Sequence, residues 1–366
     1  MKNGQDLYIG LMSGTSSDAI DAALVQFSNS GYELISTLAE PLDTPILERI
    51  KRAANGTADR VNDISELDAL LSQAFANTAL RLKAEAGVQQ ITAIGSHGQT
   101  VRHQPRGRLP YTVQLGNGAR IAALTGITTV SDFRTADLAL GGQGAPLVPA
   151  FHRAVFSDPN ENRVIINIGG IANATVLHRN NQLSGFDTGP GNTLMDHWFR
   201  QHQSGTYDKN GTWAQSGEYV AKLLSTLLEY DYFARPLPKS TGLEEFNLDW
   251  LNAYLSGDER PEDIQATLVE LTAESISQSI KTSAPATDAI YLCGGGANNK
   301  HLVNRLDQRL THLPLNTSDR IGLPPDWVEA VAFAWLAKER LEHRPTNCPE
   351  VTGSSRELAL GAVHLG

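Results

Sequence analysis

The residue with the clearest catalytic potential is Asp187, in the segment "GFDTGPGN". It ends a predicted strand and precedes a loop that contains two glycines and a proline. A carboxylate in this position can act as a general base, because strand ends that face a cleft commonly carry catalytic groups. The alternative is that Asp187 caps the next helix, but Asn192 and Thr193 are better placed to do so. We therefore predict that Asp187 is the catalytic carboxylate.

Two Gly-rich turns could hold phosphate. The run Ser13–Ser17 interrupts two predicted strands in "YIGLMSGTSSDAIDAALVQF", and "NIGGIAN", with Gly169 and Gly170, interrupts a second pair in the same way. Such turns expose backbone N–H groups that bind phosphate oxygens. Either turn alone could serve only hairpin geometry, but two turns in matching positions indicate a phosphate clamp. Asp18 could hold Mg²⁺ through water, or it could only stabilise the turn.

Three further polar side chains are candidates for substrate binding, and each has a structural alternative. His97 lies between glycines in "SHGQT" and could equally be a hydrogen-bonded histidine at a strand end. Arg134 follows a strand; it could bind an acidic substrate group, or it could pair with Asp132 or Asp137. Glu329 follows "PPDW" among small apolar residues and could simply be a solvated surface residue.

A run of three glycines, with Gly294 and Gly295 as its first two members, follows a buried strand in "AIYLCGGGANN". Glycine backbone would let a flat nucleobase or a ribose lie close to the chain. By itself such a run is weak evidence for a nucleoside site.

The elements that would position these residues occur twice along the chain. Each half begins with three short strands that predict an antiparallel meander, followed by helices and another buried strand. The predicted strands are 7–12, 20–27 and 32–39, then 163–168, 171–178 and 182–187. The main predicted helices are 46–54, 64–86, 193–201, 214–228, 261–281, 300–310 and one that opens at Pro325. Two copies of a βββαβα lobe predict a duplicated α/β fold, with the two Gly-rich turns facing each other across a cleft.

Composition narrows the class of protein. A chain of 366 residues favours two lobes, and a formal net charge of −10 argues against nucleic acid or an anionic membrane as the main partner. The two cysteines, Cys293 and Cys348, form no CxxC, which argues against a disulfide scaffold or structural zinc and favours a reducing compartment. The N-terminal segment is too short and polar for a signal peptide, and no apolar run approaches a membrane span. We expect a cytoplasmic protein.

Several well-known nucleotide and hydrolase motifs are absent from the sequence. It contains no GxxxxGK[ST] phosphate loop, no GxGxxG in a Rossmann context, no protein-kinase motif set and no GxSxG elbow. If the chain binds a nucleotide, it must do so through another arrangement of backbone donors.

Taken together, the segments resemble the anhydro-N-acetylmuramic acid kinases, within the actin/sugar kinase/Hsp70-type ATPase superfamily. The resemblance runs in order through "GLMSGTS", "SHGQTVRHQP", "GGQGAPLVPAFH", "NIGGIAN", "FDTGPGN", "PKSTG" and "EAVAFAWLA". It implies a two-lobed, duplicated actin-like/RNase H-like ATPase fold with a central cleft. We expect an N-terminal lobe of residues 1–135 and a C-terminal lobe of 136–366, with the last ~10 residues returning to the first lobe.

The resemblance also implies an activity in peptidoglycan recycling. The enzyme would use ATP and Mg²⁺ to open the internal acetal of 1,6-anhydro-N-acetylmuramic acid and to phosphorylate O6, giving N-acetylmuramic acid 6-phosphate and ADP. Its partner is thus a small anhydro amino sugar, and a homodimer would be compatible with it. Two alternatives remain open: another sugar kinase of the superfamily that acts on a free hydroxyl, and an ATP-dependent sugar sensor, although no basic helix-turn-helix precedes the first strand.

On the family pattern Asp187 is the catalytic base and "GTSSDAID" is the first ATP phosphate loop. The residues expected to bind ATP are Gly14, Thr15, Ser16, Ser17, Asp18, Ala19, Ile20, Asp21, Gly169, Gly170, Gly294 and Gly295. His97, Arg134 and Glu329 are expected to bind the sugar, and Asp18 to hold the metal through water.

The chain departs from the family pattern at four places. Ser17 and Ala19 replace a hydrophobic residue and a glycine of the first loop, and Ala136 and Leu243 stand where arginines are usual. If the glycine position requires a positive φ, Ala19 would be strained there. The arginine replacements leave open which groups bind the lactyl carboxylate of the sugar.

Overall fold

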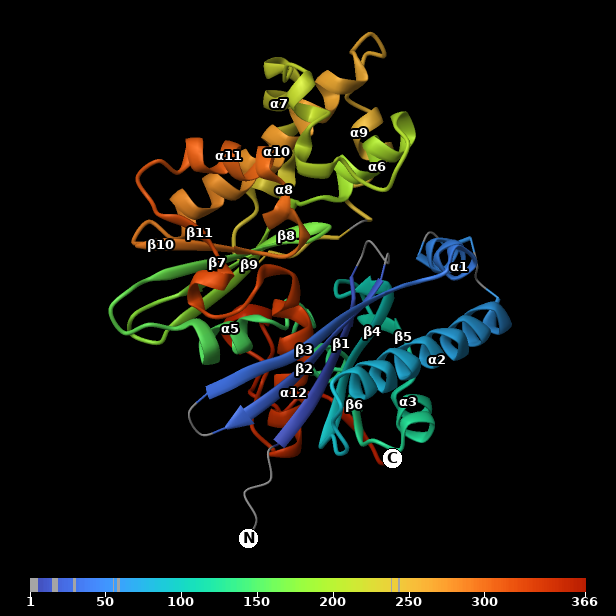
Figure 1. The fold of residues 1–366 in the computed structure, drawn as a ribbon. Helices are drawn as coiled ribbons and strands as arrows, with labels where there is room; N and C mark the ends of the chain where they lie inside the picture. The colour runs from blue at the N-terminus through green and yellow to red at the C-terminus, as the bar shows by residue number, and fades with distance from the viewer. Residues whose placement is uncertain are drawn as a thin grey trace. The chain divides into compact units, whose positions relative to one another are not determined.

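The computed structural model describes residues 6–14, 19–28, 31–54, 56–57, 60–237, 239–242 and 244–366. The chain forms two compact units (Figure 1). Unit 1 extends to Phe151 and includes the returning segment Trp327–Gly366, whereas unit 2 is His152–Asp326. The boundary therefore lies later than the expected 135/136. The returning segment also begins much earlier than the last ten residues.

Unit 1 is built on a seven-stranded sheet in the described part of the chain, with the order β12-β6-β4-β1-β2-β3 and with β5 paired to β4. The expected meander is present, because β1–β2 and β2–β3 are antiparallel, while β1–β4 and β4–β6 are parallel. The strands are β1 (Asp6–Ser13), β2 (Ala19–Ser28), β3 (Gly31–Pro41), β4 (Ala93–Gln104), β5 (Tyr111–Leu115), β6 (Thr129–Ser131) and β12 (Ala362–His364).

Two glycines of this sheet explain why helix α12 (Val328–Leu341) of the returning segment belongs to unit 1. A Cβ added at Gly10 of β1 would collide with the backbone of Ala330 and Ala334, and one at Gly95 of β4 would collide with Phe333 O. The helix therefore packs directly on the strands, as Figure 1 shows for the red helix beside the blue β1 and β2. This packing depends on contacts between distant parts of the chain. The sequence alone therefore predicted that only the last ~10 residues return to the first lobe, whereas the returning segment begins at Trp327.

The remaining helices of unit 1 are α1 (Thr44–Ala54), α2 (Val61–Glu85), α3 (Gly118–Thr125), α4 (Thr135–Ala139) and α13 (Pro349–Thr352), and α5 (Pro149–Phe156) contains the boundary. Leu67, Leu71 and Phe75 of α2 are fully buried and join Ile9 and Ile20 of the sheet in one hydrophobic core. Gly87, at φ 67°, follows the end of α2, close to the predicted helix end at residue 86.

Unit 2 repeats the sheet of unit 1 with the order β11-β10-β7-β8-β9. Strands β7–β8–β9 form the second antiparallel meander, and β10 and β11 add in parallel. The predicted duplicated α/β fold is therefore confirmed. The strands are β7 (Arg163–Ile168), β8 (Ile171–Leu177), β9 (Leu183–Pro190), β10 (Ala289–Cys293) and β11 (Leu315–Thr317).

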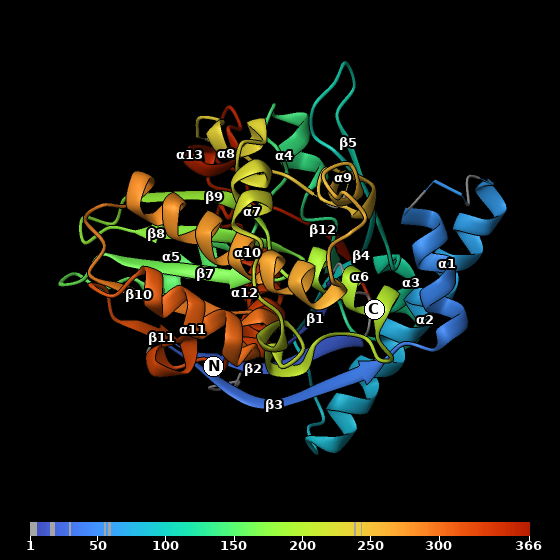
Figure 2. The same cartoon turned by 90° about the horizontal axis from the view of Figure 1, so that it is seen from above.

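Helix α10 packs on β8 and β9 and lies beside α11 (Figure 2). The helices of unit 2 are α6 (Thr193–His202), α7 (Ala221–Leu228), α8 (Asp231–Ala234), α9 (Leu248–Asn252), α10 (Pro261–Ser283) and α11 (Lys300–Arg309). In the described residues, no helix combines the length and apolar character that a bilayer crossing requires.

The helix predicted over 214–228 is wrong in its first half. Residues Ala214–Ser216 form one 3-10 turn, the chain is extended at Gly217, and the α-helix begins only at Ala221. A Cβ at Gly217 would collide with the backbone of Glu262 at the start of α10. The chain is therefore extended where it packs against α10, and the first turns of the predicted helix do not form.

Candidate active site

The first Gly-rich turn joins β1 to β2 and is anchored by Gln99 of β4. Ser13 Oγ donates to Gln99 Oε1 over 2.7 Å and also contacts Ala19 O at 3.1 Å. Gln99 Nε2 in turn donates to Gly14 O over 3.2 Å. The Gln99 side chain is 1% exposed, so these bonds are shielded from water. The expectations for Thr15, Ser16, Ser17 and Asp18, and the departure at Leu243, lie outside the described residues.

The other members of the first loop belong to β2. Ala19 is the first residue of the strand and has no positive φ, so the strain that the missing glycine suggested does not arise. Ile20 is fully buried in the core of unit 1, which leaves only its backbone to face a ligand. Asp21 pairs with Met12 across the two strands and is half-buried.

The second Gly-rich turn packs against the loop that follows Asp187. Gly191 N and Thr193 N donate to Gly170 O over 2.9 and 3.1 Å, and Asn192 N donates to Gly169 O over 2.8 Å. Asn192 occupies the N-cap of α6, but its side chain does not cap that helix. It donates to Ile168 O over 3.1 Å instead and so fixes the turn.

The glycine run after β10 reaches the same turn. Gly294 has a φ of 78° and donates its N–H to Pro325 O over 3.0 Å. A Cβ at Gly294 would collide with Asn167, and one at Gly296 would collide with Ile168. Three Gly-rich segments that are far apart in the sequence therefore meet within unit 2.

Internal crowding does not explain why glycine stands at three of the candidate positions. Of the glycines whose surroundings the structure describes, Gly14, Gly169 and Gly295 combine an ordinary φ with open space, since an added Cβ would meet nothing closer than Ile171 O at 3.5 Å. All three are among the residues expected to bind ATP. Their backbone is open to the approach of a ligand, which is the geometry that a phosphate or nucleoside needs.

Asp187 is 8% exposed and lies in β9, next to a bulge. Asn173 pairs with Asp187, whereas its neighbour Ala172 pairs with Gly189, so Thr188 is the additional residue. Bulges re-aim side chains and are common beside active sites. The backbone O of Asp187 accepts from Tyr232 Oη over 2.7 Å, so the residue is fixed in the interior of the strand rather than at a helix N-cap.

A segment of residues 239–241 borders Asp187 on its other side. Asp187 N donates to Lys239 O over 3.1 Å, and Thr241 N donates to Asp187 Oδ2 over 2.9 Å. The hydrogen bond from Thr241 N–H fixes one oxygen of the Asp187 carboxylate and favours the charged form of that carboxylate. Lys239 belongs to the "PKSTG" segment, but no property of the sequence alone marked it as a neighbour of Asp187.

Two asparagines complete a polar row across the sheet of unit 2. Asn167 of β7 pairs with Asn173 of β8, which pairs with Asp187 of β9. Residues directly opposite one another project to the same face of a sheet. Within the described structure, Oδ1 of both asparagines is buried without a hydrogen-bond partner. The two residues bracket "NIGGIAN", and this symmetry was the signal that could have identified them.

In unit 1, the structure brings two of the predicted sugar-binding residues together. Arg134 Nε and Nη2 lie 3.2 and 2.8 Å from His97 Nε2, and Arg134 Nη1 donates to Gly144 O over 2.7 Å. Because an arginine can only donate, His97 Nε2 must accept, and the proton of the neutral ring is on Nδ1. Burial and the neighbouring Arg134 charge hold the pKa of His97 well below its usual value.

The loop that accepts from Arg134 is held by Asp137. Its Oδ2 accepts from Gly144 N over 2.8 Å, and its Oδ1 accepts from Thr352 Oγ1 over 2.8 Å. Asp137 is fully buried, and its bond to Gly144 N fixes the "GGQG" loop whose Gly144 carbonyl accepts from Arg134. His103, which the sequence analysis did not single out, is also near Arg134, and burial is the main cause that lowers its pKa to about 4.

Glu329 lies in the first turn of α12 and is half-buried rather than fully solvated. Residues four apart share one face of a helix, so Glu329 is one turn from Phe333 on the same face. The Phe333 ring packs on the His97 ring with a centroid distance of 4.8 Å. The three predicted sugar-binding residues thus belong to one region of unit 1.

Among the described residues, no three His, Cys, Asp or Glu side chains are grouped to hold a metal ion. Mg²⁺ in kinases is usually held by one or two carboxylates together with substrate phosphates, rather than by a cage of protein ligands. The open glycine backbone and the buried Asp187 carboxylate fit a metal that arrives with nucleotide.

The comparisons with known proteins identify the family. The model of the family described as anhydro-N-acetylmuramic acid kinase matches residues 6–366. A relative from Coxiella burnetii (strain Dugway 5J108-111), named anhydro-N-acetylmuramic acid kinase, is 50% identical over 367 residues, which cover 99% of this chain and 98% of that protein. Relatives of the same name from Nitrosomonas europaea and Vibrio vulnificus are each 47% identical, with at least 98% of each chain covered.

Among solved structures, component A of (R)-2-hydroxyglutaryl-CoA dehydratase from Acidaminococcus fermentans matches at 13% identity and a TM-score of 0.49, over 90% of this chain and 96% of that one. The family match and the curated relatives agree over almost the full length of the chain. The chain is therefore a phosphotransferase that belongs to the anhydro-N-acetylmuramic acid kinase family.

Proposed function

We propose that the chain opens the 1,6-anhydro ring of 1,6-anhydro-N-acetylmuramic acid with water and transfers the γ-phosphoryl group of ATP to O6. The products would be N-acetylmuramic acid 6-phosphate and ADP. The observation that carries this proposal is the buried Asp187 carboxylate, whose Oδ2 is held by the Thr241 N–H at 2.9 Å beside the second Gly-rich turn.

The substrate dictates what the protein must supply. O6 of the anhydro sugar is bonded to C1, so it carries no proton and cannot act as an ordinary alcohol acceptor. The water oxygen bonds to C1 while the C1–O6 bond breaks, and O6 bonds to the γ-phosphorus as ADP departs. One water proton must leave during this step, which requires a base on the face of the sugar opposite O6.

Asp187 is the proposed base. Its fixed oxygen and its buried setting orient the carboxylate before substrate arrives, and positioned bases typically contribute about 10²–10⁴-fold in rate. Asn173, directly opposite Asp187 on β8, presents a second polar side chain on the same face of the sheet. It is the nearest candidate to help orient the attacking water.

ATP would bind along the open glycines. The backbone of Gly14 in unit 1, and of Gly169 and Gly295 in unit 2, has room for phosphate or nucleoside to approach. Mg²⁺, when bound with ATP, would offset the phosphate charge, and Asp18 is the proposed residue to hold it through water. The Gln99 bonds to Ser13 and Gly14 would keep the first turn in its binding conformation.

Arg134 is the proposed partner of the lactyl carboxylate. Its guanidinium is fixed by His97 and by the Gly144 carbonyl, and a fixed guanidinium suits the planar carboxylate. Because His97 stays neutral, it adds no second positive charge and serves to aim Arg134. Glu329, one turn from the Phe333 contact, is proposed to accept from sugar hydroxyl or amide groups.

A reducing, cytoplasmic location fits this role. Cys293 and Cys348 are both buried, and neither forms a disulfide in the described structure. Thiols in this state are typical of proteins that function where disulfides are kept reduced.

A single experiment tests the reaction. The protein is incubated with ATP, Mg²⁺ and the anhydro sugar in ¹⁸O-water, and the product is identified by mass. We expect a sugar phosphate that carries one ¹⁸O, located at C1. A product without solvent oxygen would mean transfer to a free hydroxyl, and a label in the phosphate would mean separate hydrolysis of ATP.

A further inference from the structure

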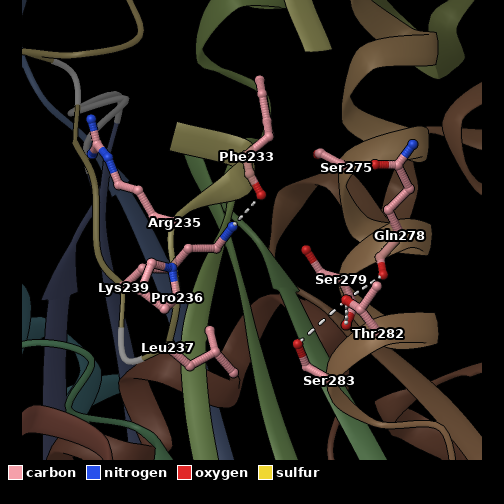
Figure 3. Close-up of a pocket in the computed structure, with 10 residues that line it drawn as sticks. All are labelled: Phe233, Arg235, Pro236, Leu237, Lys239, Ser275, Gln278, Ser279, Thr282 and Ser283. Carbon is pink, nitrogen blue, oxygen red and sulfur yellow. Dashed lines mark hydrogen bonds between the residues drawn. The ribbon is translucent and has the colours of Figure 1, made fainter. Parts of the chain in front are cut away.

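Lys239 is a buried cation on the segment that borders Asp187. It is 7% exposed, although lysine is rarely buried to this extent without a partner. It lines a cavity of about 220 Å³ together with residues from 233–237 and from α10 (Figure 3). The opposite wall consists of polar uncharged side chains: Ser275, Gln278, Ser279, Thr282 and Ser283.

The ammonium group of Lys239 is bound to the end of α8. Nζ donates to Tyr232 O and Phe233 O over 3.4 and 3.3 Å, and it lies 4.7 Å from the centre of the Tyr232 ring. A cation at the carbonyl end of a helix, over an aromatic face, is favourable on both counts. Lys239 thus fixes Tyr232, whose hydroxyl donates to Asp187 O over 2.7 Å.

The two ends of Lys239 therefore act on the same residue. Its backbone O accepts from Asp187 N, and its ammonium holds Tyr232, which donates to Asp187 O. Thr241, two residues further on, donates to the carboxylate itself. The backbone and the carboxylate of Asp187 are thus held by Tyr232, Lys239 and Thr241, and the Lys239 ammonium links Tyr232 to the 239–241 segment.

Charge supports the geometry. Burial is the main cause that lowers the pKa of Lys239, Arg235 lowers it further, and Asp187 opposes the change. The charged groups that face Lys239 are thus Arg235 on its own segment and Asp187 on β9, while α10 presents only uncharged side chains to the cavity. Lys239 and Asp187 consequently favour each other's ionised forms.

We propose that Lys239 is a positioning residue for the Asp187 base, which it holds in place through Tyr232 and keeps ionised through its charge. This inference rests on the proposed role of Asp187. It assigns no contact with substrate to Lys239.

The first test is Lys239→Met, which keeps most of the side-chain length and removes the charge. The kcat should fall about 10- to 100-fold, because small misplacements of a catalytic group cost up to this much. The KM for ATP should change little, since the proposed ATP residues are in other segments. The acidic limb of the kcat profile should move to higher pH, because Asp187 loses a neighbouring positive charge.

The matched control is Lys281→Met, which removes an exposed lysine of α10 in the same unit. It should leave kcat and the pH profile unchanged. A wild-type kcat in Lys239→Met would overturn the inference. A reduced kcat with an unshifted acidic limb would overturn the role of the charge, because that is the pattern of a purely structural lysine.

Tyr232→Phe separates position from charge and remains informative if Lys239→Met does not fold. It removes the hydroxyl that bonds to Asp187 O but retains the ring beneath Lys239. We expect a lower kcat with an unshifted acidic limb, and a wild-type kcat would overturn the positioning role.

The cavity allows a chemical rescue. In Lys239→Ala the space left by the side chain joins the cavity, so ethylammonium can enter. It should restore kcat in a saturable manner, whereas neutral propanol should not. Equal restoration by both would overturn the role of the charge.

Asp187→Asn distinguishes a failure of this inference from a failure of the proposed function. Adding Lys239→Met to Asp187→Asn should cause no further loss of rate, because the two residues act as one unit. If Asp187→Asn alone keeps near-normal activity, the base assignment fails. If Asp187→Asn is inactive but Lys239→Met is normal, only the role of Lys239 fails.

Discussion

Ser13 Oγ donates to Gln99 Oε1 over 2.7 Å at the point where β1 and β4 change register. The bond joins the first Gly-rich turn to the strand that carries His97. Gln99 also donates to Gly14 O, so one buried side chain restrains the turn at two consecutive residues. Ser13 and Gly14, at the start of the first Gly-rich turn, are thus held by a residue on another strand.

We expect Gln99→Leu to weaken ATP binding about tenfold, equivalent to about 1.4 kcal/mol. The substitution leaves the Ser13 hydroxyl and the Gly14 carbonyl without this partner, which should also lower stability by about 1–3 kcal/mol. Calorimetric titration with ATP and thermal unfolding measure the two effects. Gln114→Leu is the matched control, because Gln114 is a half-buried glutamine on β5 that bonds to Thr100 and Thr112 instead. An unchanged ATP affinity in Gln99→Leu would contradict the prediction.

The open glycines should respond to substitution differently from the crowded ones. Gly14→Val, Gly169→Val and Gly295→Val should each reduce ATP affinity with little change in unfolding temperature, because the added side chain occupies ligand space. Gly95→Ala should do the reverse: it should lower the unfolding temperature more than the ATP affinity. Its Cβ would collide with α12 and so weaken the fold itself. If the three valine variants bind ATP normally, the turns serve hairpin geometry alone.

Asp187→Asn should retain ATP binding and lose turnover by about 10²–10⁴-fold. Asparagine preserves the size of the side chain and can still accept from the Thr241 N–H, so the fold should persist. Single-turnover measurements with saturating ATP and sugar isolate the chemical step. Near-normal turnover in this variant would disprove the assignment of the base.

The strands and the larger helices were predictable because their signals are local. Alternating or continuous apolar runs end at glycine, asparagine or hydroxyl turns, and the predicted 7–12 and 163–168 differ from β1 and β7 by at most one residue at either end. The prediction of a helix over 214–228 was wrong in its first half because Gly217 packs closely against the start of α10. Local periodicity in the sequence does not report such a long-range contact.

The candidate site was predictable only where function leaves a local motif. Gly-rich turns and a carboxylate beside a Gly/Pro loop are visible in the sequence, so Gly14, Gly169 and Asp187 could be proposed from it. Gln99 and Lys239 are ordinary polar residues whose roles arise from partners on other segments. The return of α12 to unit 1 depends in the same way on small residues that match Gly10 and Gly95.

Buried histidines should make the protein less stable in mild acid. Burial lowers the pKa of His103 to about 4 and of His152 to about 3, below the usual 6.5. The unfolded chain then binds more protons as pH falls below about 6.5, so stability is full above that pH and decreases below it. Each histidine should cost about 1.4 kcal/mol at pH 5.5.

Urea unfolding at pH 7.5 and 5.5 measures this dependence. His152→Gln should reduce the difference in stability between the two pH values, whatever its effect on absolute stability. His312→Gln, which changes an exposed histidine, is the control and should leave the difference as it is. An unaltered difference in His152→Gln would exclude His152 as a source of the acid sensitivity.

The stereochemistry of the product should report how Asp187 acts. If the carboxylate deprotonates water on the face opposite O6, then the first-formed anomer has inverted configuration at C1, as in inverting glycosidases. Early NMR spectra of the reaction measure it, and they must be recorded before mutarotation mixes the anomers. Initial formation of the retained anomer would instead require a covalent intermediate, with Asp187 as nucleophile. In that case Thr241 N–H, bound to Oδ2 at 2.9 Å, would orient the attacking carboxylate rather than a base.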